Sequence, residues 1–136
     1  MKITVSTTIN ADLDTVWDCW NNPEDIKQWN TASEDWHTTQ SMVDLREGEK
    51  FSSRMEAKDG SMGFDFAGTY TTVDKPNRIE YVMEDNREVS IDFQQTDQGV
   101  TVSETFDAEK QHDPKYQKQG WQSILDNFAR YVESKS

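Results

Sequence analysis

Apolar and polar residues alternate along the first strand-like stretch of the chain. In residues 2–9, Ile3, Val5 and Ile9 fall on one side, while Thr4, Ser6 and Thr8 fall on the other. A period of two residues is typical of a β-strand that buries one face and exposes the other. The stretch is therefore predicted to be a half-buried strand.

A helical period follows this strand. Apolar residues recur there at spacings of three and four, which is typical of an amphipathic helix: Leu13, Val16, Trp17 and Trp20. Asn10 is predicted to be the N-cap of this helix or part of a turn before it, with Asp12 and Asp14 close behind. The helix should end at Asn21-Asn22, because Pro23 cannot continue it.

A second, shorter helix is predicted to begin at Pro23. Proline suits the first turn of a helix, where its missing N–H would have no partner within the helix. Ile26 and Trp29 are the expected apolar contacts of this helix, and residues 30–35 form a polar loop. The first third of the chain therefore has the predicted order strand, helix, short helix, loop.

From Trp36 onward the period returns to two. Strands are predicted at residues 37–44, 49–57, 63–73, 78–83, 87–95 and 100–107. The breaks between them contain turn residues, such as the Asp59-Gly60 pair and the polar Glu84-Asp85-Asn86 sequence, in which Asn tolerates a left-handed conformation. Short strands joined by short turns indicate an antiparallel meander.

The end of the chain is predicted to form a long amphipathic helix. Asp113-Pro114 resembles an N-cap followed by proline at the first helical position. One apolar stripe follows, with Tyr131 at its border: Trp121, Ile124, Leu125, Phe128 and Val132. Gly120 weakens the helix by roughly 1 kcal/mol relative to Ala and is expected to permit a kink or a close packing contact.

These elements together predict an α+β fold. The apolar face of the sheet must be covered, and only the last helix is long enough to cover it. No linker or repeat interrupts the 136 residues, so a single domain over residues 1–136 is expected. The predicted architecture is a helix-grip fold, in which a curved antiparallel sheet wraps around the C-terminal helix and two short helices follow the first strand.

Composition narrows the classes of partner. A net charge of −12 argues against nucleic acid and against anionic membrane surfaces, since both are bound through cationic side chains. The N-terminus does not resemble a signal peptide, and no apolar run is long enough to cross a bilayer. Cys19 is the one cysteine, which suits a reducing compartment. We therefore expect a soluble, cytoplasmic protein, and its five tryptophans predict an aromatic-rich interior.

Three stretches carry a resemblance to a known superfamily. They are residues 16–29 (VWDCWNNPEDIKQW), residues 66–81 (FAGTY followed by Val73, Pro76 and RIEY), and residues 120–131 (Gly-Trp followed by Leu125, Phe128 and Tyr131). In this order they resemble the START-like superfamily, also called SRPBCC. Within it, the chain is most similar to the family named after the C-terminal domain of the activator of the heat-shock chaperone ATPase.

The resemblance implies a helix-grip fold with a cavity between the sheet and the long helix. Members of the superfamily include lipid carriers, hormone receptors, cyclases, oxygenase subunits and chaperone regulators, so the fold alone does not give the function. The eukaryotic chaperone activators carry an additional N-terminal domain, for which this chain is expected to have no room. A chaperone or another protein nevertheless stays among the partners that the resemblance implies.

Strand parity sorts the charged residues of the predicted sheet. Three of them should face solvent, because they alternate with apolar neighbours: Arg54, Asp65 and Asp92. Glu104 shares the parity of Val102 and Phe106, which predicts an inward-facing acid with a raised pKa. The alternatives are a bulge or strand end that turns Glu104 outward, or a Tyr or Arg that hydrogen-bonds to it.

Other catalytic and metal-binding patterns are weak. His37 and His112 have no histidine or cysteine at ligand spacing, so neither a metal site nor a bound cofactor is predicted. Cys19 has the acidic neighbours Asp14 and Asp18, which disfavour a reactive thiolate. Glu104 is thus the candidate acid or base if the protein is an enzyme.

The aromatic and apolar residues of the inner parities are the stronger indication. A cavity for a small molecule is largely apolar, with a few polar groups that orient the ligand. The predicted ligand-binding residues are Trp29, Phe51, Met55, Phe64, Phe66, Tyr81, Phe93, Trp121 and Leu125. The same pattern also fits a filled core, because periodicity does not distinguish a hollow barrel from a packed one.

Three hypotheses for the function follow. The first is a domain that binds a small apolar or aromatic molecule in the cavity. The second is a cyclase-like or hydrolase-like enzyme that uses Glu104, with Tyr81 or His37 as its partner. The third is a chaperone regulator that acts through protein contacts.

Overall fold

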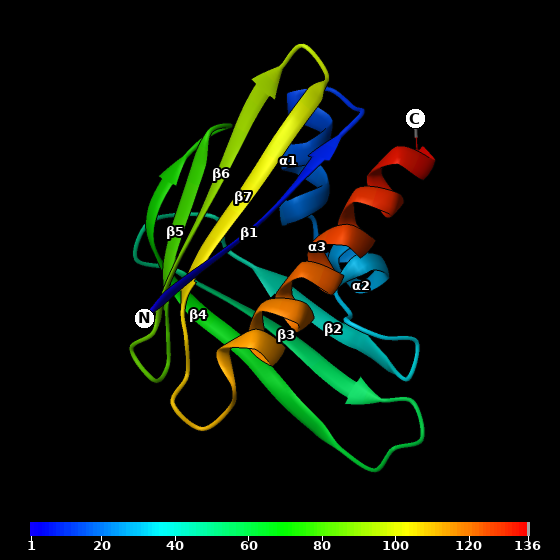
Figure 1. Ribbon diagram of the computed structural model, residues 1–136, viewed down its shortest axis with the longest axis vertical. Helices are drawn as coiled ribbons and strands as arrows, with labels where there is room; N and C mark the ends of the chain where they lie inside the picture. Colours follow the sequence, from blue (N-terminus) through cyan, green and yellow to red (C-terminus); the bar gives the residue numbers. More distant parts are fainter. Residues whose placement is uncertain (136) are drawn as a thin grey trace.

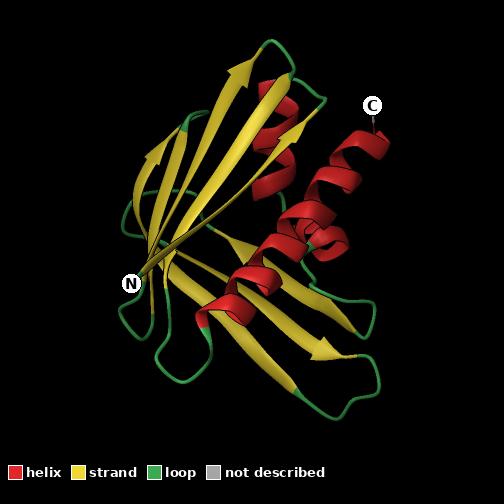
Figure 2. Cartoon of the chain, in the orientation of Figure 1, coloured by secondary structure: helices red, strands yellow, loops and turns green. Residues whose placement is uncertain are grey.

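The computed structural model describes residues 1–135 and shows one curved antiparallel sheet with three helices on its concave side (Figures 1 and 2). In chain order the elements are β1 (Lys2–Ile9), α1 (Leu13–Asn21), α2 (Pro23–Trp29), β2 (Trp36–Val43), β3 (Lys50–Ala57), β4 (Gly63–Asp74), β5 (Arg78–Met83), β6 (Glu88–Thr96), β7 (Gly99–Asp107) and α3 (Pro114–Lys135). The predicted α+β helix-grip fold is confirmed, and each predicted strand agrees to within one residue at either end.

The seven strands of the described chain form one sheet in the order β1-β7-β6-β5-β4-β3-β2. Strands β2 to β7 form the predicted meander, and β1 pairs with β7, which lies far from it in sequence. The pair places Ile3 opposite Phe106 and Ile9 opposite Val100, so apolar side chains of both strands share the concave face. Helices α1 and α2 connect the two edge strands of the sheet, β1 and β2.

The ends of the two short helices are capped by polar side chains. Asp12, rather than Asn10, is the N-cap of α1, and its Oδ1 accepts a hydrogen bond of 2.8 Å from the Thr15 amide. Asn10 instead lies in the bend before the helix, where its amide donates to Glu133. Asn22 ends α1 and also caps α2, since its side chain accepts from the Glu24 amide.

The C-terminal end of α1 depends on a tryptophan. The carbonyl of Cys19 would normally accept from the amide four residues later, but that residue is Pro23, which has no N–H. The indole Nε1 of Trp29 donates to this carbonyl over 2.9 Å in a buried position. Trp29 therefore joins α1 to α2 by supplying the donor that the proline lacks.

The densest part of the interior is aromatic and lies where the three helices meet the sheet. The ring of Trp29 lies 4.7 Å from Phe128 and 4.9 Å from Trp20, measured between centroids. Phe93 of β6 packs edge-on against Trp17 at 5.2 Å. Helix α3 packs on β1 and α2, so this end of the curved sheet is filled by side chains.

The convex face of the sheet carries ion pairs at the positions that parity predicted to face solvent. Arg78 donates to Asp92 over 2.6 Å, and Arg54 lies 3.5 Å from Asp65. The predicted outward orientation of Arg54 and Asp92 is confirmed, whereas Asp65 is exposed but is also among the residues that line the pocket described below. Within residues 1–135, no helix is both long enough and apolar enough to cross a membrane.

The last helix begins as predicted, with Pro114 in its first turn and the Asp113 side chain accepting from the Lys115 amide over 2.8 Å. The suggested close packing contact at Gly120 is wrong. A Cβ atom built on this glycine would have no neighbour within 4 Å. Gly120 therefore lies on an open part of the helix surface.

Candidate functional site

A pocket of about 850 Å³ lies between the concave face of the sheet and the helices, next to the aromatic cluster, whose Trp20 and Trp29 also line it. It is open to solvent on one side, and its walls are mostly apolar. Its volume falls within the range of about 300–1,000 Å³ that small-molecule sites occupy. The wall residues come from the three helices, from strands β2 to β5 and β7, and from the loops at the mouth.

Four aromatic rings form one wall of the pocket. The ring of Phe51 lies 4.7 Å from that of Tyr81, and Phe66 lies 6.3 Å from Tyr81 and 6.1 Å from Trp121. Gly68 makes room for them, because a Cβ atom there would lie 2.9 Å from Phe51 and 3.0 Å from Tyr81. The sequence thus places its smallest residue where two rings lie against the strand.

Trp121 is held in place by the sheet. Its ring stacks on Phe106 of β7 with centroids 3.9 Å apart and an interplanar angle of 10°. The opposite side of the ring lies half-exposed towards the pocket. Trp121 therefore fixes one wall of the site without filling its volume.

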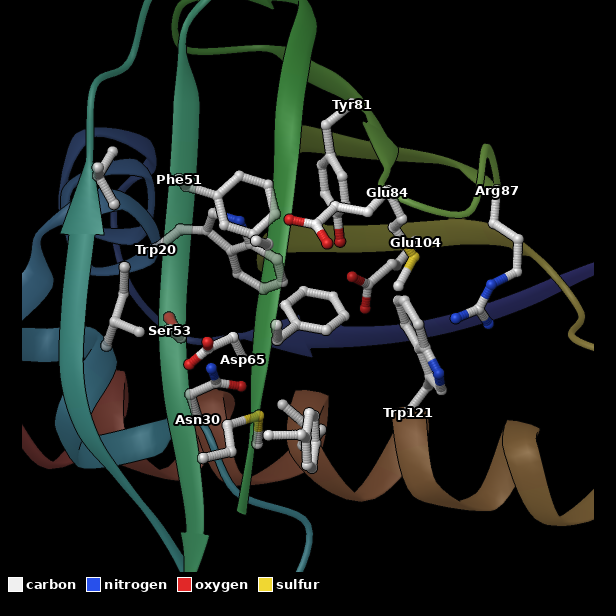
Figure 3. A pocket seen from close by; sticks show the side chains of 18 of the residues that line it. Trp20, Asn30, Phe51, Ser53, Asp65, Tyr81, Glu84, Arg87, Glu104 and Trp121 are labelled. Atoms are coloured by element: carbon white, nitrogen blue, oxygen red, sulfur yellow. The ribbon is translucent and has the colours of Figure 1, made fainter.

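Glu104 projects from β7 into this apolar pocket, between Tyr81 and Trp121 (Figure 3). Its predicted inward orientation is confirmed, since the side chain is only 6% exposed. The suggested bulge is absent here, because β7 pairs in regular register with Val5 of β1 and Ile91 of β6 at this position. Burial raises the pKa of Glu104 to about 8, since the charged form loses its hydration.

The carboxyl group of Glu104 makes no hydrogen bond with any group in residues 1–135, so the alternative of a Tyr or Arg partner is wrong. Glu104 acts electrostatically on Tyr81, and burial together with the charge of Glu104 raises the pKa of Tyr81 well above its ordinary value. The two groups point to the same part of the pocket (Figure 3). The site therefore has two buried polar groups, the carboxyl of Glu104 and the hydroxyl of Tyr81, that could hydrogen-bond to a ligand.

Seven of the nine predicted ligand-binding residues line the pocket: Trp29, Phe51, Met55, Phe64, Phe66, Tyr81 and Trp121. Phe93 and Leu125 lie elsewhere. Phe93 packs against Trp17 and Trp20, and Leu125 is completely buried in the core. These two residues have the predicted parity but lie at the filled end of the barrel, because parity fixes the face of a sheet and not the position along it.

Several lining residues were not among the predicted ones. Ser53 lines the pocket between Phe51 and Met55, with its hydroxyl 3.3 Å from that of Ser41, and Tyr70 lines it from β4. Both share the parity of predicted neighbours, so the pattern contained the signal that would have included them. Ile79, Met83 and Ile124 also line the pocket.

The mouth of the pocket is polar. It includes Glu84, Asp85 and Arg87 from the β5–β6 turn, and Glu109 and His112 from the loop before α3. Arg87 donates to Asp85 over 2.7 Å, and His112 is hydrogen-bonded to Glu109. Asn86 adopts the left-handed conformation that asparagine tolerates, with a φ of 71°.

The other candidates from the sequence do not join the pocket. His37 is exposed on β2 and is not among the lining residues, so it does not face Glu104. Cys19 is buried, and its burial together with the nearby Asp25 raises the pKa of the thiol, which disfavours a reactive thiolate. In the described part of the chain, no three His, Cys, Asp or Glu side chains are grouped closely enough to hold a metal ion.

Comparison with known proteins gives consistent similarities. The family model described as "Activator of Hsp90 ATPase homolog 1-like protein" matches residues 10–133. The solution structure of an AHSA1-like protein from Aeromonas hydrophila is 52% identical, with a TM-score of 0.94 over 99% of this chain and 94% of that chain. A Cytophaga hutchinsonii protein is 42% identical, with a TM-score of 0.85 over 98% and 93% of the two chains.

More distant similarity concerns the fold alone. A Nitrosomonas europaea protein is 17% identical and has a TM-score of 0.85, with 100% of this chain and 96% of that chain covered. No curated protein gives a significant match.

Proposed function

Since the chain belongs to the family of Activator of Hsp90 ATPase homolog 1-like proteins, we propose that it binds a small apolar or aromatic molecule in the pocket between the sheet and α3. The observation that carries this proposal is the pocket of about 850 Å³ with its wall of four aromatic rings. Burying an apolar ligand against such a wall is favourable by roughly 25 cal/mol for each Å² removed from water.

The arrangement of the rings supports a ligand with an aromatic group. The rings of Phe51, Phe66 and Tyr81 meet at steep angles of 44° to 87°, which leaves ring faces and edges turned towards the pocket. Aromatic rings accept partners in such edge-to-face arrangements. Glu104 and Tyr81 would then orient the ligand through its polar group.

The test is an NMR chemical-shift screen of the isotope-labelled protein against pooled lipids, flavonoids and small aromatic acids. The proposal expects shift changes that cluster on Trp29, Phe66, Tyr81 and Trp121 and saturate with concentration. The indole of Trp17 serves as an internal control, since it is 2% exposed and lies outside the pocket lining. A screen in which no compound shifts the pocket resonances would contradict the proposal.

Acid–base catalysis is a second candidate, and the buried Glu104 favours it. A carboxyl group with a pKa of about 8 holds its proton at neutral pH and is therefore suited to protonate a bound substrate. Tyr81 is the neighbouring group that would assist it. If a compound found in the screen is turned over, Glu104→Gln should abolish turnover while the variant stays folded, and an unchanged rate would exclude this role.

A protein partner is the alternative that the family name supports. Met62 and Phe64 are exposed apolar residues at the edge of the pocket, and Phe64 is 48% exposed. Exposed apolar residues of this kind occur at protein contact sites. Stimulation of a chaperone ATPase by the purified protein would support this function, and an ATPase rate unaffected by excess protein would count against it.

A further inference from the structure

The inner part of the pocket contains a carboxyl group whose bonding capacity is unused. Glu104 is only 6% exposed, and no group in residues 1–135 hydrogen-bonds to its carboxyl group. Buried carboxyl groups in folded proteins are nearly always paired or hydrogen-bonded, because an unpaired one loses its hydration without compensation. Since no fully buried side-chain oxygen in residues 1–135 lacks a hydrogen-bond partner, the carboxyl oxygens of Glu104 must face the open pocket, where they are available to a molecule that enters it.

The rings around Glu104 suit a cation. Glu104 lies between Tyr81 and Trp121 (Figure 3). The ring centroid of Phe66 lies 6.3 Å from that of Tyr81 and 6.1 Å from that of Trp121. The face of an aromatic ring carries partial negative charge and attracts ammonium groups within about 6 Å. Aromatic rings next to a carboxyl group form the combination that recognises alkylammonium ions.

The charged groups around the pocket also favour a cationic ligand. Opposite Glu104 on the neighbouring strands are the apolar residues Val5 and Ile91, and α3 contributes the uncharged Trp121. At the mouth, the cationic Arg87 is bound to Asp85 and His112 to Glu109, while Glu84 adds a further negative charge. With a net charge of −12 on the whole chain, the potential around the mouth favours the approach of cations over anions.

We propose that the pocket is selective for organic cations, in which an ammonium group on an apolar or aromatic body pairs with Glu104 and lies among the rings of Phe66, Tyr81 and Trp121. This inference rests on the proposed function, since it names the chemical class of the ligand for the same pocket. In this proposal the carboxylate of Glu104 neutralises the ammonium charge, and the aromatic rings surround the ammonium group.

The proposal has a consequence for pH. Without a ligand, burial keeps Glu104 protonated up to about pH 8. A cation binds the ionised carboxylate, so binding releases a proton and strengthens by up to about tenfold per pH unit until that pH, above which it levels off. Tyr81 stays uncharged over this range because its own pKa is raised.

The experiment compares two probes of the same shape. Benzyltrimethylammonium carries a permanent charge and no exchangeable proton, and neopentylbenzene replaces its nitrogen by carbon. Affinities for both are measured from the shifts of the Trp121 indole in the wild type, in Glu104→Gln and in Glu88→Gln. The last variant makes the same chemical change on the exposed start of β6, outside this pocket.

The cation is expected to bind the wild type at least about tenfold more tightly than Glu104→Gln above pH 8, with Glu88→Gln resembling the wild type. Neopentylbenzene should bind all three proteins within about twofold, because the apolar walls are unchanged. This second probe also reports that the pocket of Glu104→Gln is folded. The rise of cation affinity with pH should disappear in Glu104→Gln, which retains His112 and the other groups of the mouth.

The outcomes separate this inference from the proposed function. If neopentylbenzene binds the wild type as tightly as the cation does above pH 8, the pocket is an apolar site and the cation inference is wrong. The inference is equally wrong if Glu104→Gln leaves cation binding and its pH dependence unchanged. If neither probe binds at any pH, both this inference and the proposed function are contradicted.

Discussion

At the scale of single residues, Glu104 differs from the carboxylates of the convex face in its surroundings. Asp92 has Arg78 as a partner at 2.6 Å, whereas Glu104 faces an apolar pocket with Val5 and Ile91 on the strands beside it. An ordinary carboxyl group is ionised at neutral pH, but burial raises the pKa of Glu104 to about 8. The residue therefore affects both the stability of the fold and the chemistry of the pocket.

Glu104→Gln should change how stability depends on pH. In the unfolded chain Glu104 loses its proton near its ordinary pKa of 4.5, whereas in the folded protein it keeps the proton to about pH 8. The wild type should therefore lose stability between these two pH values, by at most about 3–5 kcal/mol from this residue. Glutamine does not titrate, so the variant should gain stability relative to the wild type as pH rises.

Urea unfolding of both proteins at pH 5 and at pH 8 measures this difference. The two free energies of unfolding should be similar at pH 5, and the variant should be the more stable protein at pH 8. If the difference between the two proteins is the same at both pH values, Glu104 is not buried in a protonated form.

Strand parity located most of the residues of the site, including Glu104, because each strand has one face towards the core. It could not tell Phe66, which borders open space, from Phe93, which packs against Trp17. That distinction depends on where the helices lie along the barrel. It arises from tertiary packing, to which the two-residue period of a strand is insensitive.

At the scale of elements, the helices were predicted at the right places, but the contacts that hold them were not. The link from Trp29 to the Cys19 carbonyl joins residues ten positions apart, and no local pattern indicates it. The pairing of β1 with β7 is likewise nonlocal, as is the register shift between Thr38 and Gln40 in β2. Local propensity therefore predicted which elements form, and long-range packing decided how they meet.

Trp29→Phe should destabilise the junction between α1 and α2. The substitution keeps an aromatic ring but removes the donor to the Cys19 carbonyl, which Pro23 cannot replace. Leaving a buried carbonyl without a partner costs about 1–3 kcal/mol. Trp36→Phe makes the same change at a half-exposed ring and should cost less in the same thermal or urea unfolding experiment. Equal losses in both variants would show that the hydrogen bond does not matter.

Gly120→Ala should stabilise α3. The added methyl group meets nothing within 4 Å, and alanine favours the helical conformation over glycine by roughly 1 kcal/mol. Gly99→Ala is the opposite case, since its φ is +130° and a Cβ atom would lie 2.1 Å from the Ile9 carbonyl oxygen. Urea unfolding should show a gain for the first variant and a loss of more than about 1 kcal/mol for the second. A loss at Gly120 would indicate that this part of the helix needs the glycine.

At the scale of the whole molecule, the pocket results from an uneven covering of the curved sheet. The helices fill one end with rings such as Trp17 and Phe128, while Phe51, Phe66 and Tyr81 line the open space at the other. The sequence predicts an apolar concave face but not its volume, because volume depends on the distance between α3 and the sheet. The resemblance to the START-like superfamily supplied that expectation where the periodicity could not.

The central claim is that this space admits an apolar ligand, and a fluorescence titration with the neutral probe N-phenyl-1-naphthylamine tests it most directly. Ile124→Trp places additional volume in the pocket from α3, whereas Gln119→Trp places the same ring on the exposed face of that helix. The account predicts saturable binding to the wild type and to Gln119→Trp, with binding to Ile124→Trp weakened by about tenfold or more. Equal affinities in all three proteins would show that the probe binds elsewhere and would contradict the claim.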